Sequence, residues 1–151
     1  MTRRYFTPTG RLLRWITSIH RIMYRLSGGR LGTTARGLPT LLLTTTGRRS
    51  GQRHTVPLPF IADAEAFVVV ASYAANPKHP AWYLNLVDHP NVTVQYRGDT
   101  QEMRAETATG ERRAALWARL ALEAPWYIEY QRRTDREIPV VVLRSDATPA
   151  P

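Results

Sequence analysis

The chain has 151 residues, enough for one domain with a sizeable core, and its 43% apolar and 22% charged residues are ordinary for a folded protein. The absence of cysteine excludes disulfides and thiolate chemistry, and the four histidines lack a zinc-helix spacing, so no metal site is expected. The net charge of +9 is unevenly placed: residues 1–62 hold eleven arginines and no acid, whereas the rest hold ten basic and twelve acidic side chains. This asymmetry predicts an anionic partner for the first half, which could be a phosphate, polycarboxylate, acidic lipid or nucleic acid.

Residues 11–26 are expected to form an amphipathic helix, because apolar side chains recur along one arc and arginines along another. Gly28 and Gly29 then end the helix. No stretch is apolar enough to span a membrane, and arginines interrupt the candidate signal-peptide core, so we expect a cytoplasmic protein. The helix either packs on the domain or lies peripherally on the inner, anionic face of the cell membrane.

The sequence predicts three segments: an N-terminal helical segment (1–27), one barrel domain (28–144) and a disordered tail (145–151). In the first half of the barrel domain, Pro57 and Pro59 cannot donate ladder hydrogen bonds on their side, so we expect a strand edge or a bulge there. The predicted strands of this half are 39–46 and 52–61, which form a hairpin across 47–51, and the continuous apolar run 67–72, which suits burial on both faces.

The second half mixes helices with strands. Pro80 opens a short helix, Thr109 is expected to cap a longer one that runs to about Glu123, and Pro125 restarts a short one. The predicted elements are a helix over 81–87, a hairpin of 91–96 and 101–107, the two later helices, and a closing strand over 138–143. About six mainly antiparallel strands without a βαβ rhythm indicate an α+β fold, a barrel with covering helices.

The segment TTTGRRSG (44–51) is the best physical candidate for anion binding. Glycines allow close approach of the backbone, backbone N–H groups can converge on an oxyanion, and two arginines supply charge-assisted donors. It is not a phosphate-binding P-loop, because Gln52 follows where that motif has lysine and a hydroxyl residue. A basic surface hairpin is the alternative interpretation.

The segment KHPAWYLNL (78–86) places Trp82, Tyr83 and Asn85 on one short helix. These side chains could pack against a planar ring and hydrogen-bond its edge. Alternatively, Trp82 and Leu86 belong to the core and Asn85 holds a neighbouring loop.

Four motifs in order give the chain a family resemblance. TTTGRRSG followed by VPL, then VVVAS, KHPAWYLNL and YQRRTDREIPVVVL resembles the deazaflavin-dependent nitroreductase family, from about Arg21 to Leu143. The resemblance implies a split β-barrel like that of flavin mononucleotide-binding oxidases. It also implies the coenzyme F420, an 8-hydroxy-5-deazaflavin that carries hydride and bears a phosphate and a polyglutamate tail, which is the kind of anionic partner the charge asymmetry predicts.

The same resemblance assigns roles to particular residues. Arg48, Arg49 and Ser50 would bind the phosphate and tail, and Tyr127 would stand near the reacting face, with the hydroxyls of Ser72, Tyr127 and Tyr130 as candidate catalytic groups. The residues expected to line or close over the deazaflavin are His54, Thr55, Val56, Pro57, Leu58, Pro59, Val70, Ala71, Ser72, Tyr73, Ala81, Trp82, Tyr83, Leu84 and Asn85.

Two positions depart from the best-known nitroreductase of the family. Tyr73 stands where that relative has a lysine, which puts one cationic contact to the tail in doubt. Ala124 stands where it has a tyrosine in the substrate pocket, which predicts a wider acceptor pocket. The resemblance implies hydride transfer from the reduced coenzyme to a small electron-poor acceptor such as a quinone or a nitroaromatic compound.

Two other classes of function stay open at this point. The same barrel could bind flavin mononucleotide and act as an oxidase. A basic barrel could also bind single-stranded nucleic acid by stacking and phosphate contacts. We do not expect nucleic acid as the partner, because the later aromatic residues, Trp117, Trp126, Tyr127 and Tyr130, lie away from the main run of arginines. The sequence leaves the oligomeric state open.

Overall fold

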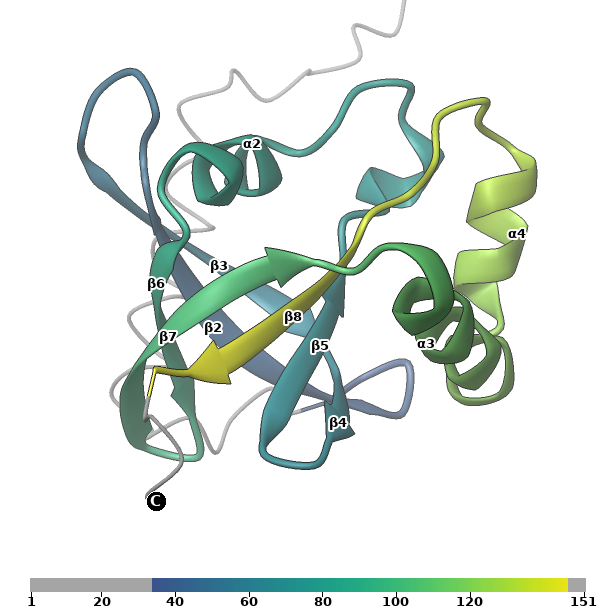
Figure 1. Cartoon of the computed structure of the whole chain (residues 1–151), viewed down its shortest axis with the longest axis horizontal. Helices are drawn as coiled ribbons and strands as arrows, with labels where there is room; N and C mark the ends of the chain where they lie inside the picture. Colours follow the sequence, from purple (N-terminus) through teal and green to yellow (C-terminus); the bar gives the residue numbers. More distant parts are fainter. Residues whose placement is uncertain (1–33, 147–151) are drawn as a thin grey trace, which may run out of the picture.

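The computed structural model describes residues 34–146, and its strands form one antiparallel sheet that curves into a barrel (Figure 1). The predicted helix over 11–26 lies outside the described residues, and so do residues 147–151 of the predicted tail (145–151). The tail prediction is wrong for Ser145, which is the last residue of strand β8. The strands are β1 (Thr34–Ala35), β2 (Leu38–Thr46), β3 (Arg53–Pro59), β4 (Ile61–Asp63), β5 (Ala66–Val70), β6 (Asn91–Tyr96), β7 (Asp99–Thr107) and β8 (Val140–Ser145). The helices are the 3₁₀ turn η1 (Tyr73–Ala75), α2 (Ala81–Asp88), α3 (Gly110–Glu123) and α4 (Trp126–Arg132).

The strand order explains how the sheet closes. It runs β1-β2-β6-β7-β8-β5-β4, and β3 pairs with the other edge of β2. Only Phe60 separates β3 from β4, so the chain itself connects the strand beside β2 to β4, the last strand of this order. The sequence predicted one strand over 52–61, but the structure divides this segment into β3 and β4 at Phe60. The strand is interrupted because the Phe60 side chain is buried and its N–H donates to the carbonyl oxygen of Pro39 at 3.0 Å. The predicted α+β split barrel is otherwise confirmed.

Two apolar clusters lie on opposite faces of β5 and β8. Val69 and Val141 face the barrel interior, whereas Val68 and Val140 face the helices α3 and α4. Both faces are therefore buried, which is why these strands read as continuous apolar runs without alternation. Helix α2 closes one end of the barrel and contributes Trp82 to the interior cluster.

Other local predictions can be compared directly. The edge expected at Pro57 and Pro59 is confirmed, because β3 pairs with β2 alone among the described strands. The side-chain cap expected from Thr109 is wrong: Thr109 is the N-cap residue of α3 with an extended backbone, but its side chain makes no capping hydrogen bond. Glu111 does lie in the first turn of that helix, where the helix dipole favours an acid.

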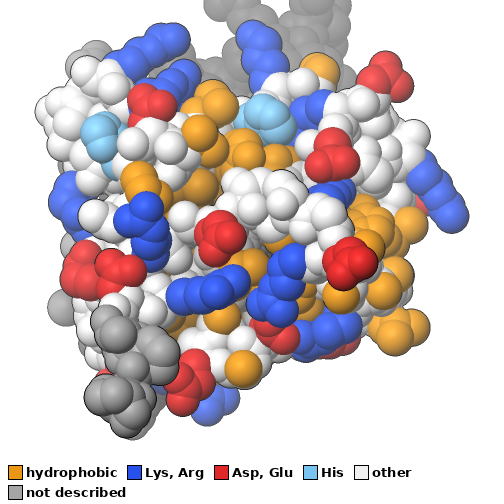
Figure 2. All heavy atoms as spheres, viewed as in Figure 1, with side chains coloured by type: hydrophobic (Ala, Val, Ile, Leu, Met, Phe, Trp, Pro, Cys, Tyr) orange, Lys and Arg blue, Asp and Glu red, His pale blue; other side chains and the backbone are white. Residues whose placement is uncertain are grey.

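The outer face over β7, β8 and α3 carries acidic and basic side chains interspersed (Figure 2). One such pair joins Arg144 of β8 to Glu106 of β7 at 3.6 Å. The positive charge of the protein is therefore not concentrated on this face. Within residues 34–146, no helix is both long and apolar enough to cross a membrane.

Candidate coenzyme and acceptor site

Two adjoining pockets lie between β3, α2 and α4. The larger, of about 580 Å³, is here called the ring pocket, and the smaller, of about 410 Å³, the basic pocket. Val56, Ala81 and Trp82 line both, so the two pockets meet at the indole of Trp82. The ring pocket is also lined by Arg36, Pro57, Leu58, Pro59, Val70, Ser72, Tyr73, Ala74, Pro80, Trp126, Tyr127 and Tyr130. The basic pocket is also lined by Gly47, Arg48, Arg49, Ser50, His54, Thr55 and Asn85.

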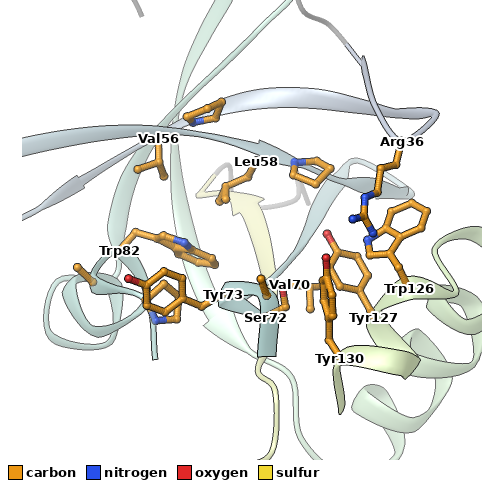
Figure 3. Close-up of a pocket in the computed structure, with 15 residues that line it drawn as sticks. Arg36, Val56, Leu58, Val70, Ser72, Tyr73, Trp82, Trp126, Tyr127 and Tyr130 are labelled. Atoms are coloured by element: carbon orange, nitrogen blue, oxygen red, sulfur yellow. The ribbon is translucent and has the colours of Figure 1, made fainter. Parts of the chain in front are cut away.

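The ring pocket has apolar walls on two sides. Val56 and Leu58 of β3 face Trp82, Val70 and the aromatic side chains of α4 across it (Figure 3). Such a slot between a strand and aromatic rings suits a flat, largely apolar molecule.

A left-handed turn forms one edge of the ring pocket. Tyr73, Ala74 and Ala75 have φ values of 46°, 49° and 64°, which are uncommon for residues other than glycine. Three such residues in succession cost conformational energy, and such strain persists only where the surrounding structure holds it. The β5 strand predicted to run to Ser72 ends at Val70, because the chain enters this turn.

Arg136 provides the contacts that hold the turn. Its guanidinium donates to the carbonyl oxygen of Ser72 at 2.7 Å and to that of Asn76 at 2.8 Å. Nη1 and Nη2 of Arg136 both donate to the carbonyl oxygen of Ala71, each at 3.2 Å. Nη1 also donates to Nδ1 of His79 at 3.2 Å. Burial, and then the charge of Arg136, hold the pKa of His79 below its ordinary value. Arg136 thus ties the connection between α4 and β8 to this edge of the pocket.

We expect Arg136→Ala to destabilise the protein by about 2–4 kcal/mol, because several carbonyl oxygens lose a charged donor. Coenzyme binding should weaken as the turn relaxes. The pKa of His79, followed by NMR titration, should rise but stay below its ordinary value, since burial remains. Arg132→Ala is the control, because exposed Arg132 pairs only with Glu129 in the described structure, at 3.6 Å. Equal melting temperatures for the two variants would contradict this role of Arg136.

The β2–β3 connection differs in one respect from what the sequence suggested. Most of its backbone N–H groups are already used within the protein: Gly47 donates to Gln52 at 2.7 Å, Gly51 to Gly47 at 2.8 Å, and Gln52 to the Ser50 hydroxyl at 3.2 Å. The N–H of Arg48 donates to Oδ1 of Asn85 at 3.1 Å. Few of these N–H groups therefore remain to converge on an oxyanion, and anion binding by this connection stays a prediction. The side chains of the loop supply most of its capacity for anions.

Those side chains remain available for a ligand. No ion pair within residues 34–146 involves Arg48, which is half-buried, or Arg49, which is exposed. Gly47 keeps the loop compact, because a Cβ there would lie 2.6 Å from the Ser50 hydroxyl. The compact β2–β3 connection thus holds the guanidinium groups of Arg48 and Arg49 beside the basic pocket, and neither forms an ion pair with another described residue.

Asn85 anchors α2 to this loop. Its side chain is buried, accepts from the Arg48 N–H, and donates through Nδ2 to the Thr45 hydroxyl at 3.3 Å. The alternative interpretation of KHPAWYLNL is thus correct for Asn85, which holds a neighbouring loop. Trp82 and Leu86 are likewise core residues, although Trp82 also lines both pockets.

Helix α4 supplies the aromatic end of the ring pocket. Tyr127 is only 4% exposed, and its ring lies 5.4 Å from that of Trp126 and 6.3 Å from that of Tyr130, centroid to centroid. Burial raises the pKa of Tyr127 to about 12, against smaller opposing effects of a hydrogen bond from Trp126 and the charge of Arg36. The phenol therefore stays protonated at neutral pH and can donate a hydrogen bond but cannot act as a base.

Most of the predicted site residues come together in these pockets, although Ala71, Tyr83 and Leu84 line neither. Ala71 is fully buried, and the Tyr83 hydroxyl lies 3.2 Å from that of Thr107. Ala124 is also fully buried, beneath Tyr127, so the small side chain there does not widen the pocket directly. The lining residues that the sequence reasoning did not assign are Arg36, Gly47, Ala74, Pro80 and Trp126.

The geometry fits one molecule with a flat ring and an anionic tail, because an aromatic slot opens directly into a basic pocket. No group of three or more potential metal ligands lies together in the described part of the chain. The barrel and its paired pockets define a split β-barrel protein with a site for a ligand of this kind.

The chain belongs to the F420H(2)-dependent quinone reductase family, whose model matches residues 15–145. It is 36% identical over 129 residues to the F420H(2)-dependent quinone reductase of Mycobacterium tuberculosis strain H37Rv, covering 83% of this chain and 87% of that protein. Among solved structures it is similar to an F420-H2-dependent reductase (FDR-A), with 38% identity, a TM-score of 0.65, and coverage of 70% and 94%. A second structure, described as a domain-swapped dimer, has 32% identity, a TM-score of 0.67, and coverage of 87% and 98%.

Proposed function

We propose that this chain is a quinone reductase that binds reduced F420 across the two pockets and transfers hydride to a quinone in the ring pocket. The observation that carries the proposal is the junction of the two pockets at Trp82. Membership of the family supports it, and so does the absence of acids from residues 1–62. A ring and a polyanionic tail joined in one molecule need an aromatic slot next to a cationic pocket.

The site residues divide into three proposed roles. Arg48, Arg49 and Ser50 bind the phosphate and carboxylates of the tail. Trp82 and the β3 side chains Val56 and Leu58 hold the deazaflavin ring. When bound, the reduced coenzyme supplies a hydride, which is two electrons and one proton.

Tyr127, Tyr130 and Ser72 line the ring pocket, and their hydroxyls are assigned to the acceptor in this proposal. The Tyr127 phenol orients the acceptor by donating a hydrogen bond, because its raised pKa of about 12 keeps the proton in place. The resemblance to nitroreductases makes nitroaromatic compounds the second acceptor class to test.

Titration with F420, flavin mononucleotide and an oligonucleotide, each followed by fluorescence, tests the coenzyme. We expect binding of F420 and oxidation of its reduced form only when a quinone is added. Tighter binding of flavin mononucleotide would favour the oxidase alternative. Binding of the oligonucleotide that weakens steeply with salt, without F420 binding, would favour the nucleic-acid alternative.

Peripheral membrane attachment through residues 11–26 is a further part of the proposal, supported by the arginine arc beside the apolar arc of that segment. Deletion of residues 1–26 should abolish sedimentation with phosphatidylglycerol vesicles at low salt, and phosphatidylcholine vesicles serve as the uncharged control. If the full chain stays in the supernatant with both kinds of vesicle, the attachment does not exist.

A further inference from the structure

Arg36 lies at one end of the ring pocket, at the tip of the hairpin that joins β1 to β2. Arg36 and Gly37 both have positive φ, 53° and 83°, as in the tight turns that join two-residue hairpins. This turn brings the guanidinium carbon to 5.5 Å from the Trp126 ring centroid and 5.8 Å from that of Tyr130. Figure 3 shows Arg36 beside Trp126, above the hydroxyls of Tyr127 and Tyr130.

This end of the pocket carries positive charge without a matching acid. No ion pair of the described residues involves Arg36, and the Tyr127 phenol beneath it stays neutral. The effect of Arg36 on the phenol, whose pKa it lowers, indicates that its field reaches into the pocket. Apart from hydroxyl groups and the indole N–H groups of Trp82 and Trp126, the other described residues of the lining are apolar. Arg36 supplies the one full positive charge among these described residues, so a negative charge that develops on a ligand oxygen would be stabilised most strongly at this end of the ring pocket.

We propose that Arg36 is a catalytic residue that contacts the acceptor and stabilises the oxygen that becomes anionic when the quinone is reduced. This inference rests on the proposed function. In the step concerned, the C5–H bond of the reduced deazaflavin breaks, and the hydrogen passes to the quinone with both electrons of that bond. The quinone becomes a hydroquinone monoanion, which takes one proton from solvent. The coenzyme, oxidised by two electrons, releases the proton of its ring N1–H to solvent, so charge and protons balance.

Two structural features suit Arg36 to this role. Stacking against Trp126 and Tyr130 orders the guanidinium before the acceptor arrives, so less side-chain entropy is lost on binding. A guanidinium is also weakly hydrated and keeps its charge at every relevant pH. A lysine would keep the charge but lose the stacking.

The test compares two ligands that differ in charge. 2-Hydroxy-1,4-naphthoquinone is an anion at neutral pH and carries the negative oxygen that the proposal requires, whereas 2-methyl-1,4-naphthoquinone is neutral. Binding of each to the enzyme without coenzyme is measured by tryptophan fluorescence, for wild type, Arg36→Ala, Arg36→Gln and Arg36→Lys. Arg97→Ala is the matched control: Arg97 also precedes a glycine at a hairpin tip, has a φ of 48° and stacks on Tyr96, but lines neither pocket.

We expect Arg36→Ala and Arg36→Gln to weaken binding of the anion by about ten- to a hundred-fold, the effect of one charge-assisted hydrogen bond. Binding of the neutral quinone should change by less than about two-fold, and Arg36→Lys should recover part of the loss. With reduced coenzyme, kcat/KM for the neutral quinone should fall by a similar factor in Arg36→Ala, while the Kd of F420 stays as in Arg97→Ala.

The outcomes separate this inference from the proposed function. If the wild-type protein does not oxidise reduced F420 with any quinone, the proposed function fails. The binding comparison still tests whether Arg36 recognises an anionic oxygen. If the wild type is active and Arg36→Ala matches it in both binding and kcat/KM, Arg36 has no role toward the acceptor. A loss of F420 affinity equal to the loss of activity would make Arg36 a coenzyme ligand and overturn the proposal.

Discussion

Replacement of Arg48 and Arg49 together by alanine is expected to weaken F420 binding by about a hundred-fold at low salt. Each charge-assisted hydrogen bond contributes about 1.5–3 kcal/mol, and the exposure of Arg49 reduces its share. The difference between variant and wild type should shrink at high salt, because screening weakens the contacts of the wild type. Fluorescence titration at two salt concentrations measures both effects.

Arg53→Ala provides the control for this experiment. Arg53 lies on the same hairpin and is exposed, but its guanidinium donates to the Thr93 hydroxyl and it lines neither pocket. It therefore reports the loss of one nearby positive charge without a direct ligand contact. If Arg48→Ala and Arg49→Ala each weaken binding no more than Arg53→Ala does, general charge rather than direct contact attracts the tail.

Tyr127→Phe is expected to slow hydride transfer to a quinone by about 10²–10³-fold, the usual effect of removing one preorganised donor at a developing oxyanion. The ring packing survives the change, so the melting temperature and the Kd of F420 should stay nearly constant. Because the pKa of Tyr127 is about 12, the group should add no inflection to the rate profile between about pH 6 and pH 9. Stopped-flow oxidation of the reduced coenzyme measures the rate.

Tyr83→Phe is the matched control, since the Tyr83 hydroxyl lies beside that of Thr107 and away from both pockets. A purely structural Tyr127 would show the reverse pattern, with lower stability and an unchanged rate per folded molecule. Equal transfer rates for Tyr127→Phe and wild type across several quinones would remove this hydroxyl from the mechanism.

The sequence predicts the fold well where local pattern decides it. The apolar runs of β5 and β8, the hairpin of β6 and β7, and the start of α2 after Pro80 all follow from composition and turn residues. The interruption between β3 and β4 at Phe60 could not be predicted from the local sequence, because it depends on a hydrogen bond to Pro39, some twenty residues earlier. The left-handed turn at Tyr73–Ala75 was hidden for the same reason, since its residues carry no glycine signal and Arg136 holds it from the far end of the chain.

The site residues also divide into those that the sequence motifs identify and those whose position depends on contacts between distant segments. The family resemblance led to Arg48, Trp82 and Tyr127, all of which line the pockets. It did not lead to Arg36, because its position depends on a hairpin turn with positive φ at an arginine and on stacking against α4. One signal was available: an Arg-Gly pair before a strand, together with Trp126, an aromatic residue without an assigned role that stands next to Tyr127 in the sequence.

The prolines of β3 have a consequence beyond the pockets they line. Pro57 and Pro59 are two residues apart, so both missing N–H groups belong to the same side of the strand. Pairing with β2 continues across both positions, from Thr40 opposite Pro59 to Thr46 opposite Arg53, which places that side at the open edge. An edge without two of its donors is a poor template for another chain to extend the sheet. Among the described strands, the outer edge of β3 has no neighbour, and the prolines make this edge a poor site for aggregation. Replacing either proline by threonine or valine would restore a donor that promotes self-association.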